Sequence, residues 1–193
     1  MSEAATDRSA MQAVEIRVTG NRLRWPGGEA PCVLGRGGVR EDKREGDGAT
    51  PVGRFVLRRV LWRADRLPCP QTGLPVQPIA VDDGWCDAPD DPAYNRPVRR
   101  PYPASHETMW RDDHVYDIVV VMGHNDDPVV PGHGSAVFLH LARPDRAPTA
   151  GCVALAMEDM LRLLKECGPG SALSVSCQAA DTMANRMPDT PAG

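Results

Sequence analysis

Glycine and proline interrupt this chain from end to end, which limits every regular element to a short length. The 193 residues include 18 glycines and 19 prolines. Glycine is too flexible for long regular elements, and proline lacks the N–H that such elements use. We therefore expect many short elements joined by turns. A chain of this size suffices for one domain with a sizeable core but not for two.

Most of the regular segments have the composition of β-strands. Residues 117–123 (Asp-Ile-Val-Val-Val-Met-Gly) form a near-continuous apolar run, which predicts a buried central strand. Residues 15–18 and 21–25 surround a Gly20-Asn21 turn and predict a hairpin. We expect further strands at 31–34, 55–62, 136–140 and 172–177.

Only one segment has a convincing helical pattern, at residues 158–166, and it ends near Gly168-Pro169-Gly170. The segments 35–48 and 82–113 are rich in glycine, proline and charge and predict loops. Long loops of the second kind are usually functional. The predicted fold is therefore mostly β, with a mixed sheet, one main helix and long loops. We expect a folded domain at 13–177, a disordered segment at 1–12 and a loose tail at 178–193.

Composition argues against several classes of partner. The net charge of −4 and the pI near 5.7 provide no basic surface for nucleic acid or an anionic membrane. No segment approaches the roughly 18 consecutive apolar residues of a membrane span. The first ten residues have no basic head followed by an apolar run, so we expect no secretory signal and a cytoplasmic location. Without a secretory signal we expect the six cysteines to stay reduced. They form no Cys-x-x-Cys pair, so we expect no metal site.

The segment Thr149-Ala150-Gly151-Cys152-Val153-Ala154-Leu155 contains a candidate nucleophile, twelve residues after His140. A thiol attacks well only after losing its proton, usually to an imidazole that the fold brings near. Met157, Met160, Leu161 and Leu164 recur at helical spacing after this cysteine. We therefore expect Cys152 at a helix N-terminus, where the helix dipole lowers a thiol pKa. The alternative interpretation is a small buried cysteine with a packing role alone.

An earlier segment, 45–56, reads Glu-Gly-Asp-Gly-Ala-Thr-Pro-Val-Gly-Arg-Phe-Val. Together with His140 and the Gly151-Cys152 pair, in this order, it resembles the L,D-transpeptidase catalytic domain, the YkuD-type family of bacterial peptidoglycan enzymes. The resemblance runs from about residue 15 to about residue 175. It implies a β-sandwich-like catalytic domain at 13–177.

The resemblance also implies a role for each matching residue. Cys152 would be the nucleophile and His140 the general base and acid. The backbone carbonyl of Leu141 would orient His140, and the backbone N–H groups around Gly151 would form the oxyanion hole. No cofactor or metal is implied.

Four further residues are candidates for substrate binding. Thr149 lies in the nucleophile turn, where a simple helix-entry role is the alternative. His124 and Asn125 follow the apolar strand, and Tyr94 lies within the long loop. A surface loop histidine is the alternative for His124, and loop packing is the alternative for Tyr94.

The chain departs from the commonest family pattern beside the nucleophile. Ala150 stands where that pattern has histidine, and Ala154 where it has arginine. The resulting Cys-Val-Ala-Leu variant resembles a branch that includes hydrolases. The implied substrate is a peptidoglycan stem tetrapeptide or muropeptide, cut between a diamino acid and D-alanine. We expect a cytoplasmic L,D-carboxypeptidase of muropeptide recycling. The alternatives are a crosslinking L,D-transpeptidase, which would be periplasmic if the start is misannotated, and an inactive peptidoglycan-binding module.

Overall fold

The structure is a computed structural model that describes residues 12–177. The segments expected to be disordered (1–12) and loose (178–193) lie outside the described residues, apart from position 12.

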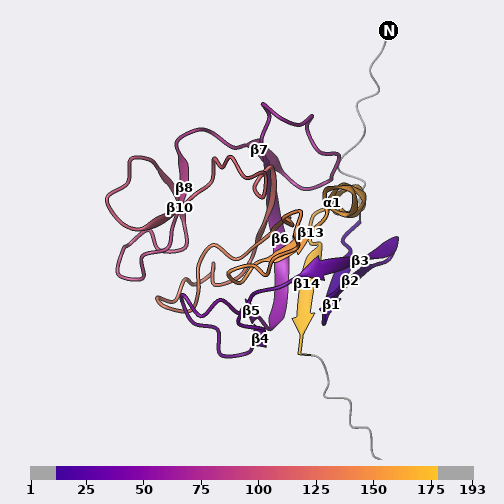
Figure 1. Ribbon diagram of the computed structural model, residues 1–193, viewed down its shortest axis with the longest axis horizontal. Coiled ribbons are helices and arrows are strands. Elements are labelled where there is room, and N and C mark those ends of the chain that lie inside the picture. Colours follow the sequence, from indigo (N-terminus) through magenta and orange to yellow (C-terminus); the bar gives the residue numbers. More distant parts are fainter. Residues whose placement is uncertain (1–11, 178–193) are drawn as a thin grey trace, which may run out of the picture.

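A nine-stranded sheet forms most of the described molecule (Figure 1). Along this sheet the strands follow the order β11-β12-β13-β3-β2-β1-β14-β6-β7, and β11 also pairs with β6. Their bounds in chain order are β1 Glu15–Thr19, β2 Arg22–Trp25, β3 Gly28–Val33, β6 Gly53–Trp62, β7 Val76–Pro78, β11 Ile118–Met122, β12 Phe138–Leu141, β13 Val153–Leu155 and β14 Ala172–Ser176.

Two strands bend this sheet so that its halves face one another. The first part of β6 (53–56) pairs with β14, and the remainder (57–62) pairs with β11. In the same way β3 pairs with β2 through residues 28–31 and with β13 through 32–33. Parallel pairs (β1–β14, β12–β13 and β6–β7) occur beside antiparallel ones. The expected mostly β, sandwich-like fold with a mixed sheet is confirmed.

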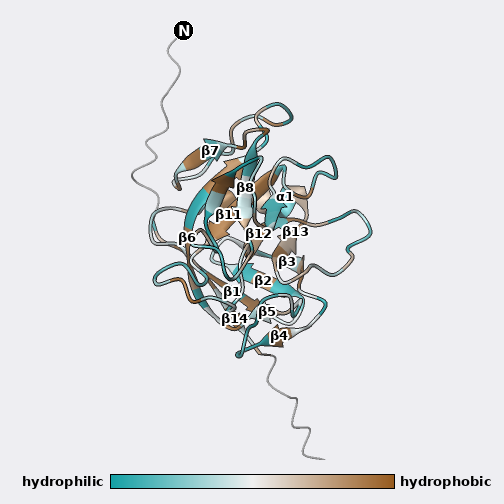
Figure 2. Cartoon of the chain, turned by 90° about the vertical axis from the view of Figure 1, so that its left-hand side faces the viewer, coloured by the Kyte–Doolittle hydropathy of each residue, from teal (hydrophilic) through white to brown (hydrophobic). Residues whose placement is uncertain are grey.

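The main core lies between these halves. Strand side chains alternate between two faces, so Leu139 and Leu141 of β12 face this core, as do Val153 and Leu155 of β13. The helix α1, Met157–Leu164, adds Met160, Leu163 and Leu164. Both ribbon views place α1 beside β3 and β13 (Figures 1 and 2), and the fully apolar β11 is brown along its length in Figure 2. Each such fully buried side chain stabilises the fold by about 1.5–3 kcal/mol.

A smaller sheet covers the outer face of β11 and β12. It consists of β8 Asp83–Cys86, β9 Pro97–Arg99 and β10 His106–Thr108, in the order β10-β8-β9. Trp85 and Met109 bury themselves there against Val119, Val121 and Phe138. The expectation that 82–113 is a loop without strands was therefore wrong. Strands of three or four residues, separated by prolines, show no alternation that could be recognised, and tertiary packing stabilises them.

The chain also folds differently from expectation at two other places. The predicted loop 35–48 contains β4, Val39–Arg40, which pairs with β5, Thr50–Pro51. The helical pattern that we extended back to Cys152 is wrong at its start, because β13 precedes the helix and α1 begins at Met157. Within 12–177 no helix reaches the length and hydrophobicity that a membrane span requires.

Candidate active site

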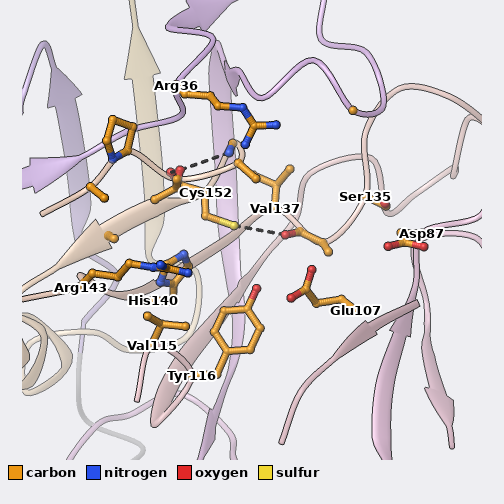
Figure 3. Close-up of a pocket in the computed structure, with 18 of the residues that line it drawn as sticks. Arg36, Asp87, Glu107, Val115, Tyr116, Ser135, Val137, His140, Arg143 and Cys152 are labelled. Carbon is orange, nitrogen blue, oxygen red and sulfur yellow. Dashed lines mark hydrogen bonds between the residues drawn. The ribbon is translucent and has the colours of Figure 1, made fainter. Parts of the chain in front are cut away.

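Two neighbouring parallel strands bring the candidate histidine and cysteine together. His140 on β12 is in register with Ala154 on β13, and Cys152 immediately precedes β13. Because Leu139 and Val153 face the main core, His140 and Cys152 face the opposite side. There they line one cavity of about 460 Å³ (Figure 3).

The imidazole of His140 is held by the backbone of the next residue. Its Nδ1 lies 2.9 Å from the carbonyl oxygen of Leu141. A carbonyl can only accept, so Nδ1 bears the proton in the neutral ring and Nε2 is left as the acceptor. The ring of Tyr116 packs edge-on against the imidazole at 5.3 Å between centroids. Burial lowers the pKa of His140 to about 4, and the nearby charges of Arg111 and Arg143 act in the same direction.

The thiol of Cys152 is buried and hydrogen-bonded to the backbone. It donates to the carbonyl oxygen of Ala136 at 3.2 Å and accepts the N–H of Phe138 at 3.3 Å. Burial raises the pKa of this thiol to about 12, although the Phe138 N–H and the charge of Lys43 oppose the shift. The expected lowering of its pKa by a helix dipole was wrong. β13 separates Cys152 from the N-terminus of α1, and the dipole effect fades within a single turn.

Thr149 organises the turn that precedes the nucleophile. Its Oγ1 accepts the N–H of Gly151 at 3.1 Å and donates to the carbonyl oxygen of Cys152 at 2.6 Å. The N–H of Gly151, expected to help form an oxyanion hole, is therefore already used within the turn.

The early motif packs directly against this turn. Asp47 accepts hydrogen bonds from the backbone N–H groups of Arg44 and Ala49 and from the ammonium of Lys43. These three bonds outweigh burial and lower the pKa of Asp47. Thr50 accepts the N–H of Gly35 at 2.9 Å. The Asp-Gly-Ala-Thr segment thus packs against the nucleophile turn and holds it in place.

Three expected substrate contacts do not line this cavity. The hydroxyl of Tyr94 donates to Glu45 and accepts the N–H of Gly134, and the side chain is 2% exposed. His124 Nε2 lies 3.1 Å from the carbonyl oxygen of His133. The amide of Asn125 donates to the carbonyl oxygens of Val130 and Gly134. Their hydrogen bonds connect loops to one another, so this placement does not support direct substrate contact.

The cavity also contains charged residues that the sequence did not mark. Arg111 forms ion pairs with Glu107 at 2.8 Å and Asp113 at 2.6 Å, and its guanidinium lies 5.0 Å from the centre of the Tyr116 ring. Arg36, Lys43, Glu45, Asp87 and Arg143 are further lining residues. They come from separate loops and from the small sheet, so no local motif could reveal them.

Comparison with known proteins agrees with the early motif and the Gly-Cys turn. The family described as the L,D-transpeptidase catalytic domain, YkuD, matches residues 4–175. A crystal structure of Mycobacterium tuberculosis L,D-transpeptidase 1 is similar with a TM-score of 0.38 and 11% sequence identity, over 84% of this chain and 58% of that one. This chain thus spans less than two thirds of that protein, and no curated protein matches it. The chain belongs to the YkuD family of L,D-transpeptidase catalytic domains.

Proposed function

We propose that this protein is a cysteine-dependent acyl-transfer enzyme that acts on peptidoglycan stem peptides. The supporting observation is the shared cavity of Cys152 and His140, with His140 Nδ1 held by the Leu141 carbonyl. This contact leaves Nε2 free to accept a proton. The scissile bond joins the L-centre of a diamino acid to D-alanine.

In this proposal His140 moves one proton twice in the first half-reaction. Nε2 accepts the thiol proton as Sγ attacks the carbonyl carbon, and the Cys152 N–H stabilises the oxyanion. Collapse breaks the C–N bond, and the departing amine of D-alanine takes the proton back from Nε2. The acyl group is left as a thioester on Sγ. His140 then accepts a proton from water as the water attacks the thioester carbonyl. The C–S bond breaks, the tripeptide acid leaves, and Nε2 returns the proton to Sγ.

The resting pair is neutral in this mechanism. The pKa of His140 is about 4, and burial raises that of Cys152 to about 12. A thiolate–imidazolium pair is therefore disfavoured before substrate binds. Proton transfer then accompanies attack, since the base becomes charged only as the sulfur forms its new bond.

We propose water as the acceptor, so that the enzyme is an L,D-carboxypeptidase of muropeptide recycling. The Cys-Val-Ala-Leu variant, with Ala154 after the nucleophile, resembles the hydrolase-containing branch of the family. Purified protein should release D-alanine from a defined stem tetrapeptide, and mass spectrometry would detect the tripeptide. Cys152→Ala should abolish release, whereas Cys69→Ala, at an exposed thiol outside the cavity, should not. Turnover by Cys152→Ala would refute the thiol mechanism.

Family membership keeps crosslinking as a second candidate. An L,D-transpeptidase would form stem-peptide dimers when an acceptor stem is added to the same assay. We propose a cytoplasmic location. Fractionation of cells that express a tagged copy tests this, and a periplasmic tag would favour crosslinking.

The raised thiol pKa is the observation that favours a third candidate, an inactive peptidoglycan-binding module. Such a module would bind the tetrapeptide without release of D-alanine. It would also leave Cys152 unmodified by a carbapenem, which acylates a working nucleophile of this kind. Intact-protein mass spectrometry after incubation with a carbapenem separates the two cases.

A further inference from the structure

The charges that line the cavity differ in how well they are already paired. Lys43 is bound to Asp47, Glu45 accepts the hydroxyls of Tyr94 and Ser135, and Arg111 is held by two carboxylates. These groups have their partners within the protein. Arg36, Arg143 and Asp87 are the exceptions, and they are the charges that a ligand could engage.

Asp87 lines the cavity, and one oxygen of its carboxylate is unsatisfied. Its Oδ1 is buried and has no hydrogen-bond partner among residues 12–177. Leaving a buried acceptor unpaired is unfavourable, so such an atom is often completed by a ligand. Glu107 belongs to the same wall, and burial together with the neighbouring Asp87 raises its pKa. Arg111 pairs with Glu107, and the hydroxyl of Tyr116 donates to the same carboxylate. This wall, formed by Asp87 and Glu107, is acidic, and Asp87 adds an unsatisfied acceptor for a cation.

Two arginines provide the opposite charge near Cys152. The backbone N–H of Arg36 donates to the carbonyl oxygen of Thr149 at 2.9 Å, and its side-chain stem lies along Gly48. No acceptor for its guanidinium lies within hydrogen-bond distance in the described part of the chain. Arg143 follows β12, and its ion pair with Asp113 is long at 3.7 Å. Both guanidiniums are therefore available to an anion.

The acidic and basic groups lie in different directions from the nucleophile. In Figure 3 Arg143 lies on one side of Cys152 and Asp87 on the other, with Glu107 between Cys152 and Asp87 and Arg36 above the sulfur. The elements that supply them differ as well. Asp87 directly follows β8 and Glu107 lies on β10, whereas the arginines come from loops that follow β3 and β12. Ala150 and Ala154, beside the nucleophile, contribute no charge.

We propose that this polarised cleft binds a zwitterionic peptide in one direction. Arg36 and Arg143 bind the terminal carboxylate of the leaving residue, and Asp87 with Glu107 binds a free primary ammonium on the acyl side. This inference rests on the proposed function, in which the ammonium is the side-chain amine of the diamino acid. It adds a selectivity: the substrate is an uncrosslinked stem with a free C-terminus. Acylation of the amine in a crosslink, or extension of the C-terminus, removes one of the two charges.

The test measures two variants, Asp87→Asn and Arg36→Gln, with three peptides. The peptides are the parent tetrapeptide and two altered forms, one acetylated on the side-chain amine and one amidated at the C-terminus. The wild-type protein should lose roughly 10- to 100-fold in kcat/KM with either altered peptide, the range expected for one hydrogen-bonded charge. Asp87→Asn should lower kcat/KM for the parent peptide and no longer discriminate against the acetylated one, while still discriminating against the amide. Arg36→Gln should show the reverse pattern.

Two surface variants serve as controls. Asp90→Asn and Arg40→Gln change the same charges on exposed residues outside the cavity, and they should retain both discriminations. Asp87→Asn should not lower the melting temperature, because it removes an unsatisfied carboxylate. Equal losses on all three peptides in both variants, or a wild-type protein that treats the three alike, would overturn the proposal.

Binding separates this proposal from the proposed function. Titration calorimetry with the Cys152→Ala protein measures affinity for the three peptides without turnover. The same crossed pattern is expected when Asp87→Asn or Arg36→Gln is added to that background. If each variant loses its own discrimination in binding but the wild-type protein releases no D-alanine, the proposed enzyme activity is refuted and the proposed cleft is supported. Release of D-alanine without any preference in binding or in kcat/KM would refute the cleft alone.

Discussion

The carbonyl oxygen of Ala49 lies 2.9 Å from the point that a Cβ on Gly151 would occupy. Residues 102 positions apart in sequence thus pack backbone against backbone at the nucleophile turn. Gly151 also has a φ of +141°, which side chains rarely tolerate. The early segment (45–56) and the Gly-Cys turn therefore form a single packed unit, because the early segment fits against the turn only when position 151 is a glycine.

Gly151→Ala should impair both folding and activity. The added methyl group would push the Ala49 carbonyl or the turn itself away, and we expect a loss of about 1–3 kcal/mol in the free energy of unfolding. A shift of the sulfur by about 1 Å would lower kcat roughly 100-fold. Urea denaturation and D-alanine release measure these effects. Gly132→Ala is the control, because its φ is +79° but nothing lies within 4 Å of the added carbon. Equal behaviour of the two variants would contradict the packing argument.

Much of the sheet was predictable because its strands are locally apolar. The run at 117–123 and the hairpin at 15–25 became β11 and β1–β2. β13 was missed because its three apolar residues directly precede the apolar residues of α1 and were included in the helical pattern. The small sheet was missed because Trp85 and Met109 are buried by contacts with distant strands, and such contacts leave no local pattern.

The site was predictable in its residue types but not in its electrostatics. His140 and Cys152 were recognisable from their order and from the Gly-Cys turn, and they line one cavity. The protonation of the thiol depends on its burial beneath Phe138 and Ala136, which only the assembled sheet determines. For the same reason the sequence suggested a lowered thiol pKa, whereas burial raises it.

The fall in kcat/KM on the acid side of the pH–rate profile should report the pKa of His140. The ring must be neutral to accept a proton, and its pKa of about 4 keeps it neutral down to mildly acidic pH. We expect kcat/KM for D-alanine release to fall with a midpoint near pH 4. An unperturbed histidine would place this midpoint near pH 6.5. Unfolding must be monitored in parallel, since a histidine with a lowered folded pKa costs stability as the pH falls below 6.5. A midpoint near 6.5 in folded protein would show that the ring is solvated.

Alkylation of Cys152 should be slow at neutral pH in the absence of substrate. Iodoacetamide reacts with the thiolate, and a pKa of about 12 leaves very little of it. The rate should rise about tenfold per pH unit between pH 7 and 10 without reaching a plateau. Peptide mapping by mass spectrometry follows Cys152, and the exposed Cys69 is the internal reference. Rapid, pH-independent modification of Cys152 would contradict a neutral resting pair.

Asp47→Asn should destabilise the protein more than the loss of a surface charge. Lys43, whose side chain is 7% exposed, would be left without its counter-charge. Removing one partner of a buried pair costs on the order of 3 kcal/mol. The lowered pKa of Asp47 means that its contribution is present at neutral pH and is lost as the pH falls through that pKa. Chemical denaturation at pH 7 should show the loss. Glu29→Gln, whose pairs with Arg22 and Arg24 are about half exposed, should cost less than about 1 kcal/mol.

Asn95→Ala should loosen the contact between the small sheet and the nucleophile. The Oδ1 of Asn95 accepts the indole N–H of Trp85 and the backbone N–H of Ala136, and its amide donates to the carbonyl oxygens of His124 and Asn125. Alanine would leave these groups unpaired in a buried position, for a loss of roughly 2–4 kcal/mol in the free energy of unfolding.

The same change should also reach the thiol, because the carbonyl of Ala136 accepts the Cys152 hydrogen bond. We expect faster alkylation of Cys152 in Asn95→Ala, as displacement of Ala136 admits water to the sulfur. Asn21→Ala, in the exposed hairpin turn between β1 and β2, is the control and should change stability by less than about 0.5 kcal/mol. A destabilised Asn95→Ala protein whose Cys152 still reacts as slowly as in the wild type would show that the small sheet stabilises the fold without shaping the site.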